Sequence, residues 1–489
     1  MTLLTLACRC LTRGTAVATA ALLAACASHP DITPSAVVLN RVTLPIPDQP
    51  ARSHDAWPQD NWWTAYGDPQ LNQLIDHALA ASPTLAAARA RIARAQAAAD
   101  LAGTATVPQI NGAIDTSYGR LSEHYQIPKP PLGKGGQSVS QGRAVLDFSY
   151  DLDLWNRNAA LIRSADAQRK AAAFDLDAAR LALAASIARA YAQLASQHEV
   201  QDVLLATQQQ RELIRKLAGQ RAASGLDTQV ELKQAESSVA ALHGDLAQLV
   251  AAMDVTRLQL AVLAGAMPLA AQEIRRPVLA TVPFAIPRTL PFDLLGRRPE
   301  LAAQRARITA AIGEAQAAKA QFYPNINLIA LIGFQSIGLG QLFSAGSLMT
   351  SAGPAIRMPL FDGGRLRASH ASRIADIDAA VAQYNQSVLT AAQEVAEQLT
   401  HAAGLTHEEK ATQEALAAAE EAHRLAMLRY RAGLSSYLTV LSVETQLLGQ
   451  RRAAAELKAK LRDSQIVLMR ALGGGFMDTA PVTAVSARQ

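Results

Sequence analysis

Apolar side chains change their spacing along the chain. Between residues 157 and 223 they recur at steps of three, four or seven, as at Leu176, Leu183 and Ile187, which is the spacing of a coiled-coil seam. Between residues 144 and 154 they alternate with polar side chains, which is the period of a β-strand with one apolar face. The pattern predicts long packed helices interrupted by strands.

The second half of the chain repeats the first. Pro83 recurs as Pro299 and Gly225 recurs as Gly433, each within a short matching motif. An internal duplication builds two equivalent units that pack on each other or on copies in neighbouring chains. The expected divisions are a signal segment at residues 1–25, a tether at 26–60, repeat 1 at 61–267, a linker at 268–291, repeat 2 at 292–473 and a tail at 474–489.

Two windows without proline predict the longest helices. No proline occurs between Pro131 and Pro268, or between Pro359 and Pro481, and both windows are rich in Ala, Leu, Gln, Glu and Arg, which favour helix. A helix over residues 157–223 would be on the order of 100 Å long at about 1.5 Å per residue. Because no ordinary globular core is that wide, these helices are expected to pack side by side as a rod or tube.

A shorter helix is expected to open each repeat, followed by a β-hairpin. In repeat 1, Asp68 is the expected N-cap and Pro69 the first helical residue, with a break near Pro83. The hairpins are expected at about residues 108–155 and 324–360. The fold class is therefore mainly α with a membrane β-barrel portion, in which each chain supplies two hairpins.

Two hairpins cannot close a membrane barrel by themselves, because every unpaired backbone group costs several kcal/mol in hydrocarbon and the smallest membrane barrels use about eight strands. The chain must pool its strands with copies of itself. Two chains would give a barrel filled by its own side chains, and three would give about twelve strands around water. Asp147, Asp151 and Asp153 occupy polar positions of the second strand and would then line the lumen. A merely solvated face is the alternative.

The first 26 residues predict a lipoprotein signal. Arg9 and Arg13 precede an apolar run from Ala16 to Ala25, which is too short to span a bilayer. The run closes with Leu23-Ala24-Ala25-Cys26, which resembles a lipoprotein signal-peptidase box. We expect Cys26 to carry an S-diacylglycerol and an N-acyl chain; an ordinary signal with a bystander cysteine is the alternative. All three cysteines lie at or before Cys26, so the cleaved chain is expected to form no internal disulfide.

Composition and motifs give no indication of catalysis. The net charge of +5 argues neither for nor against nucleic acid, and no nucleic-acid partner is expected. The ten histidines are scattered without metal spacing, no Gly-x-Ser-x-Gly elbow occurs, and residues 133–136 lack the full phosphate-loop pattern. We therefore expect neither an enzyme nor a metal or other cofactor beyond the covalent lipid.

Five motifs carry a family resemblance. They are Trp62-Trp63-x-x-Tyr66-Gly67-Asp68-Pro69, Arg297-Arg298-Pro299-Glu300-Leu301, Phe322-Tyr323-Pro324, Pro359-Leu360-Phe361-Asp362-Gly363-Gly364-Arg365 and Leu428-Arg429-Tyr430-x-x-Gly433-Leu434-Ser435-Ser436-Tyr437-Leu438. Together they look like the TolC-type outer membrane factors, and more narrowly like the NodT-type lipoprotein branch that serves tripartite drug-efflux pumps. The resemblance implies a homotrimer with a twelve-strand outer-membrane barrel and a twelve-helix periplasmic tunnel. Its implied partners are outer membrane lipid, a periplasmic adaptor and an inner-membrane pump of the resistance-nodulation-division type.

Two Gly-Leu turns sit where one long helix should reverse into the next. A glycine is expected there because the residue after a helix C-cap needs a positive φ, and Asp227 or Ser435 can cap the helix that follows. This structural role predicts the glycines whether or not anything binds. The resemblance adds that the turns form the adaptor contact at the periplasmic tip. The implied contact residues are Gly225, Leu226, Asp227, Gly433, Leu434 and Ser435.

The resemblance also places an aperture gate just beyond the second turn. Leu438 fits a hydrophobic ring, with coiled-coil packing as the alternative. Thr439 and Ser442 stand where relatives often have aspartates. Closure is therefore expected to depend on apolar and hydrogen-bonded contacts rather than on an acid lock or a cation site.

The function that these features favour is a passive, trimeric, lipid-anchored exit duct for small-molecule efflux. The expected cargo is drugs and aromatic or other toxic compounds, and the energy must come from a partner. One alternative keeps the fold and changes the cargo to proteins or metal ions. Another is a periplasmic coiled-coil scaffold without a pore.

Overall fold

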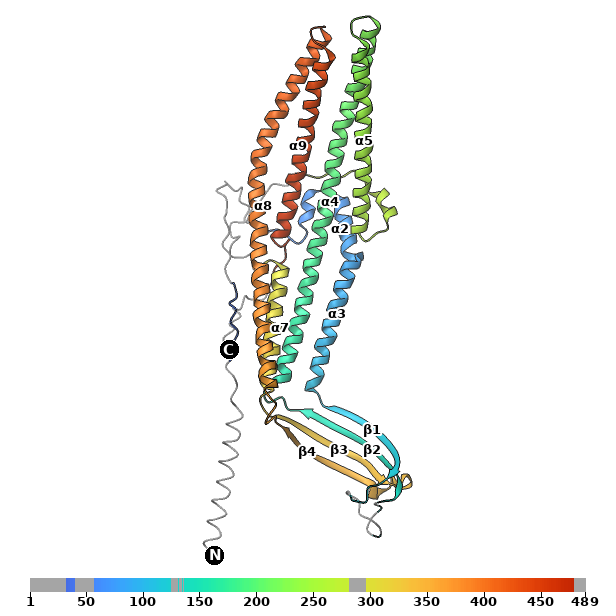
Figure 1. Ribbon diagram of the computed structural model, residues 1–489, viewed down its shortest axis with the longest axis vertical. Helices are drawn as coiled ribbons and strands as arrows, with labels where there is room; N and C mark the ends of the chain where they lie inside the picture. Colours follow the sequence, from blue (N-terminus) through green and yellow to red (C-terminus); the bar gives the residue numbers. More distant parts are fainter. Residues whose placement is uncertain are drawn as a thin grey trace.

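The computed structural model describes residues 32–39, 57–124, 131, 134, 136–280 and 296–478. Figure 1 shows an elongated molecule with long helices at one end and a curved four-stranded sheet at the other. The predicted signal segment, Cys26, part of the tether, most of the first hairpin loop, part of the linker and the end of the tail lie outside the described residues.

Both repeats show the same order of elements: a helix, a hairpin and a long helical hairpin. In repeat 1 these are η1 Trp62–Tyr66, α2 Pro69–Ala81, α3 Pro83–Gly103, η2 Thr104–Thr106, β1 Gln109–Arg120, β2 Ser138–Asp151, α4 Arg157–Ala223 and α5 Gln229–Leu263; η3 Pro268–Glu273 opens the linker. In repeat 2 they are α7 Pro299–Ala320, β3 Asn325–Ile337, η5 Leu339–Gln341, η6 Ala345–Ser347, β4 Leu348–Arg357, α8 Arg365–Arg431 and α9 Tyr437–Ala471. The predicted helix over residues 157–223 is confirmed.

The start of α2 follows from its first two residues. Asp68 is the N-cap and accepts a hydrogen bond from the backbone N–H of Gln70 at 2.9 Å. The same carboxylate accepts from the Tyr191 hydroxyl at 2.7 Å and from the Val278 backbone at 2.9 Å. Because Tyr191 lies on α4, this one cap also fixes the short N-terminal helix to the long one.

The helices form a row of four over the whole length of the rod. Near the sheet, α3 packs on α4, α4 on α7 and α7 on α8; towards the far end, α5 packs on α4, α4 on α9 and α9 on α8. The two sets of four helices form two layers of the rod. Figure 1 shows α4 and α8 running through both layers, with α3 and α7 nearer the sheet and α5 and α9 nearer the far end. In both layers α8 lies at one edge of the row, and α3 or α5 lies at the other. Within the described chain neither edge has a further helix beside it.

The α5 edge carries apolar side chains that the chain itself leaves uncovered. They are Val230, Val250, Val255, Leu258 and Val262. By length and composition alone α5 is also apolar enough to cross a membrane, but it packs along α4 in the helical row. An exposed apolar stripe at the edge of an open row is typical of a surface that another protein chain covers.

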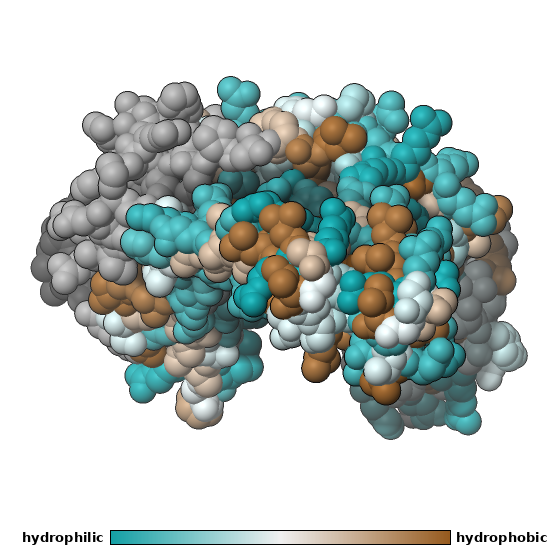
Figure 2. Space-filling model, turned by 90° about the horizontal axis from the view of Figure 1, so that it is seen from above, coloured by the Kyte–Doolittle hydropathy of each residue, from teal (hydrophilic) through white to brown (hydrophobic). Residues whose placement is uncertain are grey.

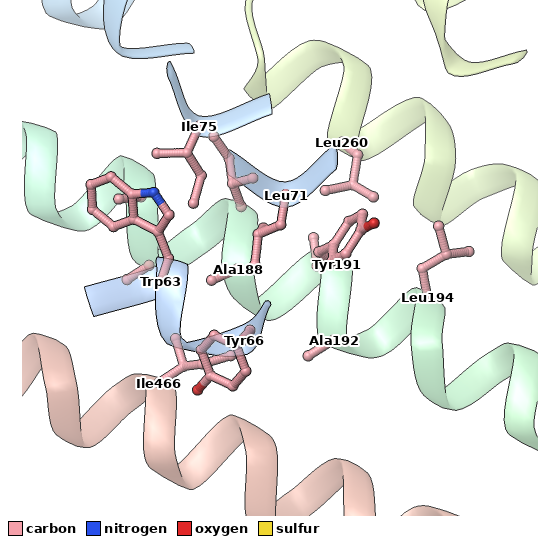
Figure 3. Packing of buried hydrophobic residues seen from close by; sticks show 14 of the residues in the cluster. Trp63, Tyr66, Leu71, Ile75, Ala188, Tyr191, Ala192, Leu194, Leu260 and Ile466 are labelled. Carbon is pink, nitrogen blue, oxygen red and sulfur yellow. The ribbon is translucent and has the colours of Figure 1, made fainter. Parts of the chain in front are cut away.

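The largest core cluster fastens the N-terminal elements to the long helices (Figure 3). Trp63 and Tyr66 are only 6% and 3% exposed. They pack with Leu71, Ile75, Ala188, Tyr191, Leu194, Leu260 and Ile466. The Trp62-Trp63 motif is thus core and not a membrane-surface anchor. Many positions in this core are alanine, which buries little area per residue but permits close helix approach.

The sheet has the order β1-β2-β3-β4 and is antiparallel throughout. Its register brings Asp147 between Asn111 and Leu331, and Val145 between Ala113 and Gly333. Positions that pair across strands share a face. The opposite face carries the exposed apolar side chains Ile110, Ile114, Tyr118, Leu146, Leu328, Ile332, Leu348 and Ile356. The outer edges of β1 and β4 have no partner strand within the described chain.

Residues 32–39, within the predicted extended tether, are bonded along α8. Asp378 of α8 accepts hydrogen bonds from the backbone N–H and hydroxyl of Ser35 and from the backbone N–H of Ala36, each at 2.9 Å. Asn385 accepts from Leu39 at 2.9 Å and donates to the Val37 carbonyl at 2.8 Å. The side chains of Asp378 and Asn385 thus form hydrogen bonds with the backbone of this segment, as a neighbouring strand would. We call residues 32–39 the N-terminal strap.

Candidate functional site

The far ends of the two helical hairpins have the same backbone geometry. Gly225 and Gly433 have φ values of 72° and 77°. The N–H of Leu226 donates to the Arg221 carbonyl, and the N–H of Leu434 donates to the Arg429 carbonyl, each at 2.8 Å. With the glycine N–H bonded three residues back, this is a Schellman ending in both repeats. No atom lies within 4 Å of an added Cβ at either glycine, so conformation and not space requires glycine here.

The helix caps lie one residue later than the sequence indicated. Thr228 caps α5: its hydroxyl accepts from the Val230 N–H at 3.1 Å, and its own N–H donates to Glu231 at 2.9 Å. Ser436 is the N-cap of α9 and makes no side-chain cap bond. The prediction that Asp227 or Ser435 would cap is therefore wrong. Asp227 is unavailable because its carboxylate is bound by an arginine.

Asp227 instead ties the first turn to the second repeat. Its carboxylate accepts from Arg221 Nε at 2.8 Å and Nη2 at 3.2 Å, and from the Tyr430 hydroxyl at 3.3 Å. The Arg221 guanidinium lies 5.1 Å from the centre of the Tyr430 ring, within cation–π range. The hydrogen bonds from Arg221 hold the pKa of Asp227 below its usual range. Burial and the nearby Asp227 raise the pKa of Tyr430 to about 12, so Tyr430 donates and Asp227 accepts at neutral pH.

Both turns present an apolar side chain at the very end of the rod. Leu226 is 67% exposed and Leu434 is 70% exposed. Figure 2, seen from above this end, shows separate apolar patches within a largely hydrophilic surface. Ser435 is half-buried, and its hydroxyl has no hydrogen-bond partner among the described residues. We call residues 225–227 and 433–435 the tip. Its chemistry suits contact with another protein.

The three predicted gate residues lie on the exposed side of α9. Tyr437, Val440 and Glu444 face the core, whereas Leu438 is 57% exposed. Thr439 and Ser442 are also exposed. Packing within the described chain therefore does not account for Leu438. The assignment of these residues to an aperture remains a prediction.

A buried ion pair below the tip was missed by the sequence analysis. Arg211 Nε lies 3.3 Å from Glu444 Oε2, with the two side chains 9% and 2% exposed. Arg211 also donates to the Ser238 carbonyl at 2.9 Å. Burial raises the pKa of Glu444, and the positive charge of Arg211 only partly offsets it. The available signal was an acid within the apolar stripe that includes Tyr437 and Val440.

The three predicted barrel acids do not share one environment. Asp147 lies on the polar face of β2, opposite the exposed apolar residues. Asp151 ends β2 and accepts from the Asn325 amide at 3.1 Å. The assignment of Asp153 to the strand is wrong. Asp153 has a φ of 44° and accepts from the backbone N–H groups of Asn158 and Ala159, each at 2.9 Å, where α4 begins.

The family is decided by a sequence comparison that covers both repeats. The profile described as "Outer membrane efflux protein" matches residues 74–266 and 290–474. The chain belongs to the outer membrane efflux protein family. It is an efflux protein of the outer membrane, and its rod and sheet correspond to the helical tunnel and β-barrel portions of the TolC-like channels. The family is one of efflux channels.

The sequence is also similar to individual proteins whose names refer to drug resistance or export. The chain is 33% identical over 426 residues to the multidrug resistance outer membrane protein MdtP of Escherichia coli (strain K12), covering 86% of this chain and 87% of that one. It is 34% identical over 359 residues to the fusaric acid resistance protein FusA of Burkholderia cepacia, covering 72% and 67%. It is 31% identical over 439 residues to the pyoverdine export outer membrane protein OpmQ of Pseudomonas putida (strain KT2440), covering 88% and 91%.

Solved structures share the fold over most of the length of this chain. The outer membrane protein VceC from Vibrio cholerae is 37% identical with a TM-score of 0.80, covering 86% of this chain and 100% of that one. The outer-membrane channel OprN is 26% identical with a TM-score of 0.82, covering 91% and 99%. Within the described part of this chain, no group of three or more His, Cys, Asp or Glu residues is arranged to hold a metal ion.

Proposed function

We propose that three copies of this chain form a lipid-anchored exit duct for small organic molecules. The single observation that carries the proposal is the sheet. One face is apolar and exposed, the other carries the charged side chains of β1 and β2 together with Ile329 and Leu331 of β3, and β1 and β4 each leave an edge without a partner strand in the described chain. An unpaired edge is not tolerated in hydrocarbon. Pairing β4 of one copy with β1 of the next removes every edge once the ring closes.

A barrel built from three copies suits the charged side chains of the inner face better than a barrel built from two. A barrel of about eight strands is filled by its own side chains, whereas about twelve leave an aqueous interior. The inner face would carry Asn111, Asp115, Arg143 and Asp147, which share the polar side of the sheet. These groups need water. The helical row, which is also open at both edges, would close around the same axis as a tunnel.

A lipid on Cys26 would attach the chain at the sheet end of the rod. An extended segment from Cys26 to Ser35 spans at most about 30 Å. The strap bonds Ser35 to Asp378, which lies about 20 Å along α8 from Arg365 at 1.5 Å per residue. The segment is therefore long enough for a lipidated Cys26 to reach the membrane that holds the sheet. Mass spectrometry of the mature N-terminus tests this assignment.

The tip would contact a periplasmic adaptor, through which an inner-membrane pump of the resistance-nodulation-division class supplies the energy. Support comes from Leu226 and Leu434, whose apolar side chains stay exposed at the end of the rod farthest from the sheet. Single exposed apolar side chains are common on protein surfaces, so the support lies in their recurrence at the equivalent turns of both repeats. The repeat 2 turn is proposed as the stronger contact.

The relatives favour small organic cargo. Their printed names refer to multidrug resistance, fusaric acid resistance and pyoverdine export. Protein or metal-ion export would keep the same fold but has no such support among these relatives. Deleting the gene and measuring sensitivity to drugs, dyes, aromatic acids and metal salts distinguishes these cargo classes.

Leu434→Glu tests the duct and its tip together, with Leu226→Glu as the matched variant in repeat 1. Both residues are exposed, so neither change should disturb folding. We expect Leu434→Glu to abolish efflux of a fluorescent drug from whole cells and Leu226→Glu to weaken it less, while both proteins still migrate as trimers. Normal efflux in Leu434→Glu would refute the tip assignment. Absence of a trimer in the unmodified protein would refute the duct.

A further inference from the structure

A polar cavity of about 500 Å³ lies where the sheet meets the helices, at the opposite end of the rod from the tip. Three arginines line it: Arg157 at the start of α4, Arg357 at the end of β4 and Arg365 at the start of α8. Its volume falls within the range of small-molecule sites. We call it the neck cavity.

The neck cavity holds positive charge that the chain leaves unpaired. Within the described residues none of the three arginines forms an ion pair. Arg157 Nε is buried without a hydrogen-bond partner, as is the Oδ1 atom of Asn327, which lines the same cavity. A buried polar group without a partner costs about 1–3 kcal/mol. Arg157 Nε is a donor that an anion would satisfy, whereas Asn327 Oδ1 is an acceptor and would need an O–H or N–H donor such as water.

Two acids also line the cavity, but both are already engaged. Asp153 accepts from two backbone N–H groups at the start of α4. Asp151 accepts from the Asn325 amide and from the Asp153 N–H, each at 3.1 Å. Three guanidinium groups therefore outnumber the two occupied carboxylates of the lining. Asp362 is not a lining residue, but it attracts Arg365 electrostatically while its carboxylate accepts from the backbone N–H groups of Gly364 and Leu366. The positive ends of the α4 and α8 helix dipoles add to the same sign of potential.

An aromatic surface borders this charge. Trp155 stacks on Tyr323 with ring centres 4.7 Å apart at an interplanar angle of 20°. The Trp155 indole N–H donates to the Pro324 carbonyl at 2.7 Å, which fixes the ring, yet the residue remains 45% exposed. Both aromatic residues line the cavity. Guanidinium groups next to a fixed aromatic ring suit a ligand that carries both a carboxylate and a ring.

The cavity opens on the polar side of the sheet. Asp151 pairs with Asn327, and Asn325 pairs with Arg357, on the same face as Asp147. If the chain forms the proposed duct, on which this inference rests, that face lines the lumen. Arg157 and Arg365 each begin the long first helix of a helical hairpin, so both repeats contribute one arginine to the same place.

We propose that the neck cavity is an anion site in the duct wall that takes aromatic carboxylates. Cargo of this class would be held at the passage from tunnel to barrel, and small anions would be favoured over small cations in conduction. The effect is electrostatic, so it weakens as salt screens the guanidinium charges. The site is distinct from the tip and from the predicted aperture residues of α9.

The test compares the purified full-length protein with the Arg157→Gln/Arg357→Gln/Arg365→Gln variant. The probe is 2-naphthoate, and 2-naphthylmethylammonium is the cation of matched shape. In equilibrium dialysis at low salt we expect the unmodified protein to bind 2-naphthoate, the variant to bind it at least tenfold more weakly, and neither to retain the cation. Arg143→Gln, on the polar face of β2 away from the cavity, is the control and should bind normally.

A planar-bilayer measurement gives an independent readout. In a KCl gradient the reversal potential should shift towards cation selectivity in the triple variant and much less in Arg143→Gln. If the triple variant fails to fold, Arg157→Gln/Arg365→Gln leaves the strand unchanged and should give a smaller shift of the same sign. Equal binding of the two probes, or unchanged binding and reversal potential in a folded variant, would overturn the anion site. A protein that folds but never conducts would overturn the duct itself.

Discussion

Arg211 and Glu444 form an ion pair across the interface between the two repeats, with the Nε and Oε2 atoms 3.3 Å apart. Arg211 lies on α4 and Glu444 on α9, so the pair joins the two helical hairpins beneath the tip. Tyr437 lies on the same buried stripe of α9 and bonds weakly to Ser238 at 3.4 Å. It is the most buried of the ion pairs between the two repeats among the described residues; Arg189–Asp463 and Arg462–Glu199 also join α4 to α9 but are more exposed.

Glu444→Ala should destabilise the helical rod by about 3 kcal/mol, because it leaves the Arg211 charge buried without its partner. The double variant Arg211→Met/Glu444→Leu removes both charges and should regain most or all of that loss. Thermal unfolding followed by circular dichroism at 222 nm measures both. Equal destabilisation of the single and double variants would show that volume, not charge, sets the cost.

The same pair predicts a pH dependence. Burial raises the pKa of Glu444 in the folded state, so the folded protein holds this proton to a higher pH than the unfolded chain does. The stabilisation is fully present below the unfolded pKa of about 4.3 and is lost as the pH rises through the folded value. The melting temperature of the unmodified protein should therefore fall relative to Glu444→Gln as pH rises from 4 towards neutrality. A constant difference would contradict this sign.

Asp227→Ala should loosen the tip, since it releases Arg221 and the Tyr430 hydroxyl together. We expect a loss of about 1–3 kcal/mol in local stability, read as faster hydrogen exchange in residues 221–231 with the rest of the rod unchanged. Tyr430→Phe keeps the ring under Arg221 and removes only one long hydrogen bond, so its effect should be smaller. Because the Asp227 pKa is lowered from its ordinary value of 3.8, its contribution should be lost only as the pH falls below that value and through the folded pKa, where acid should mimic Asp227→Ala. Exchange that is uniform along α4 would argue against a local link.

Asp378→Ala should release the N-terminal strap without unfolding α8. Burial opposes ionisation of Asp378, but hydrogen bonds from Ala36 and Ser35 outweigh it and lower its pKa. We expect faster proteolytic cleavage within residues 32–39 and an unchanged trimer. Asp376→Ala, two residues away on α8 and outside the strap contacts, is the control. Equal cleavage of the two variants would show that Asp378 does not hold the strap.

Gly333→Ala should prevent assembly of the sheet. An added Cβ would lie 2.3 Å from the Ala144 carbonyl oxygen and 2.6 Å from the Val145 Cα, both backbone atoms that cannot rotate away. Gly353 on β4 has no atom within 4 Å of an added Cβ, so Gly353→Ala is the matched control. We expect trimers in SDS without heating only for the control and the unmodified protein. A normal trimer in Gly333→Ala would require the β2–β3 register to differ.

Local patterns determined much of this molecule. The period of seven, the absence of proline and the chain length that they cover were enough to predict the helix over residues 157–223. Alternation predicted β2, and the positive φ required after a helix predicted Gly225 and Gly433. Each of these features depends on backbone preferences within a few residues, so the sequence contains them directly. The duplication then predicted the second copy from the first.

Only the tertiary structure decided which groups meet. The alternation of apolar and polar residues continues in the sequence past the end of β2, yet Asp153 is not part of the strand. Its carboxylate instead accepts from the unpaired backbone N–H groups at the start of α4, where the helix dipole favours a negative charge. The strap contact with Asp378 and the Arg211–Glu444 pair join residues hundreds of positions apart. A charge has no sequence period that identifies its partner. That choice depends on how helices far apart in the chain are brought side by side.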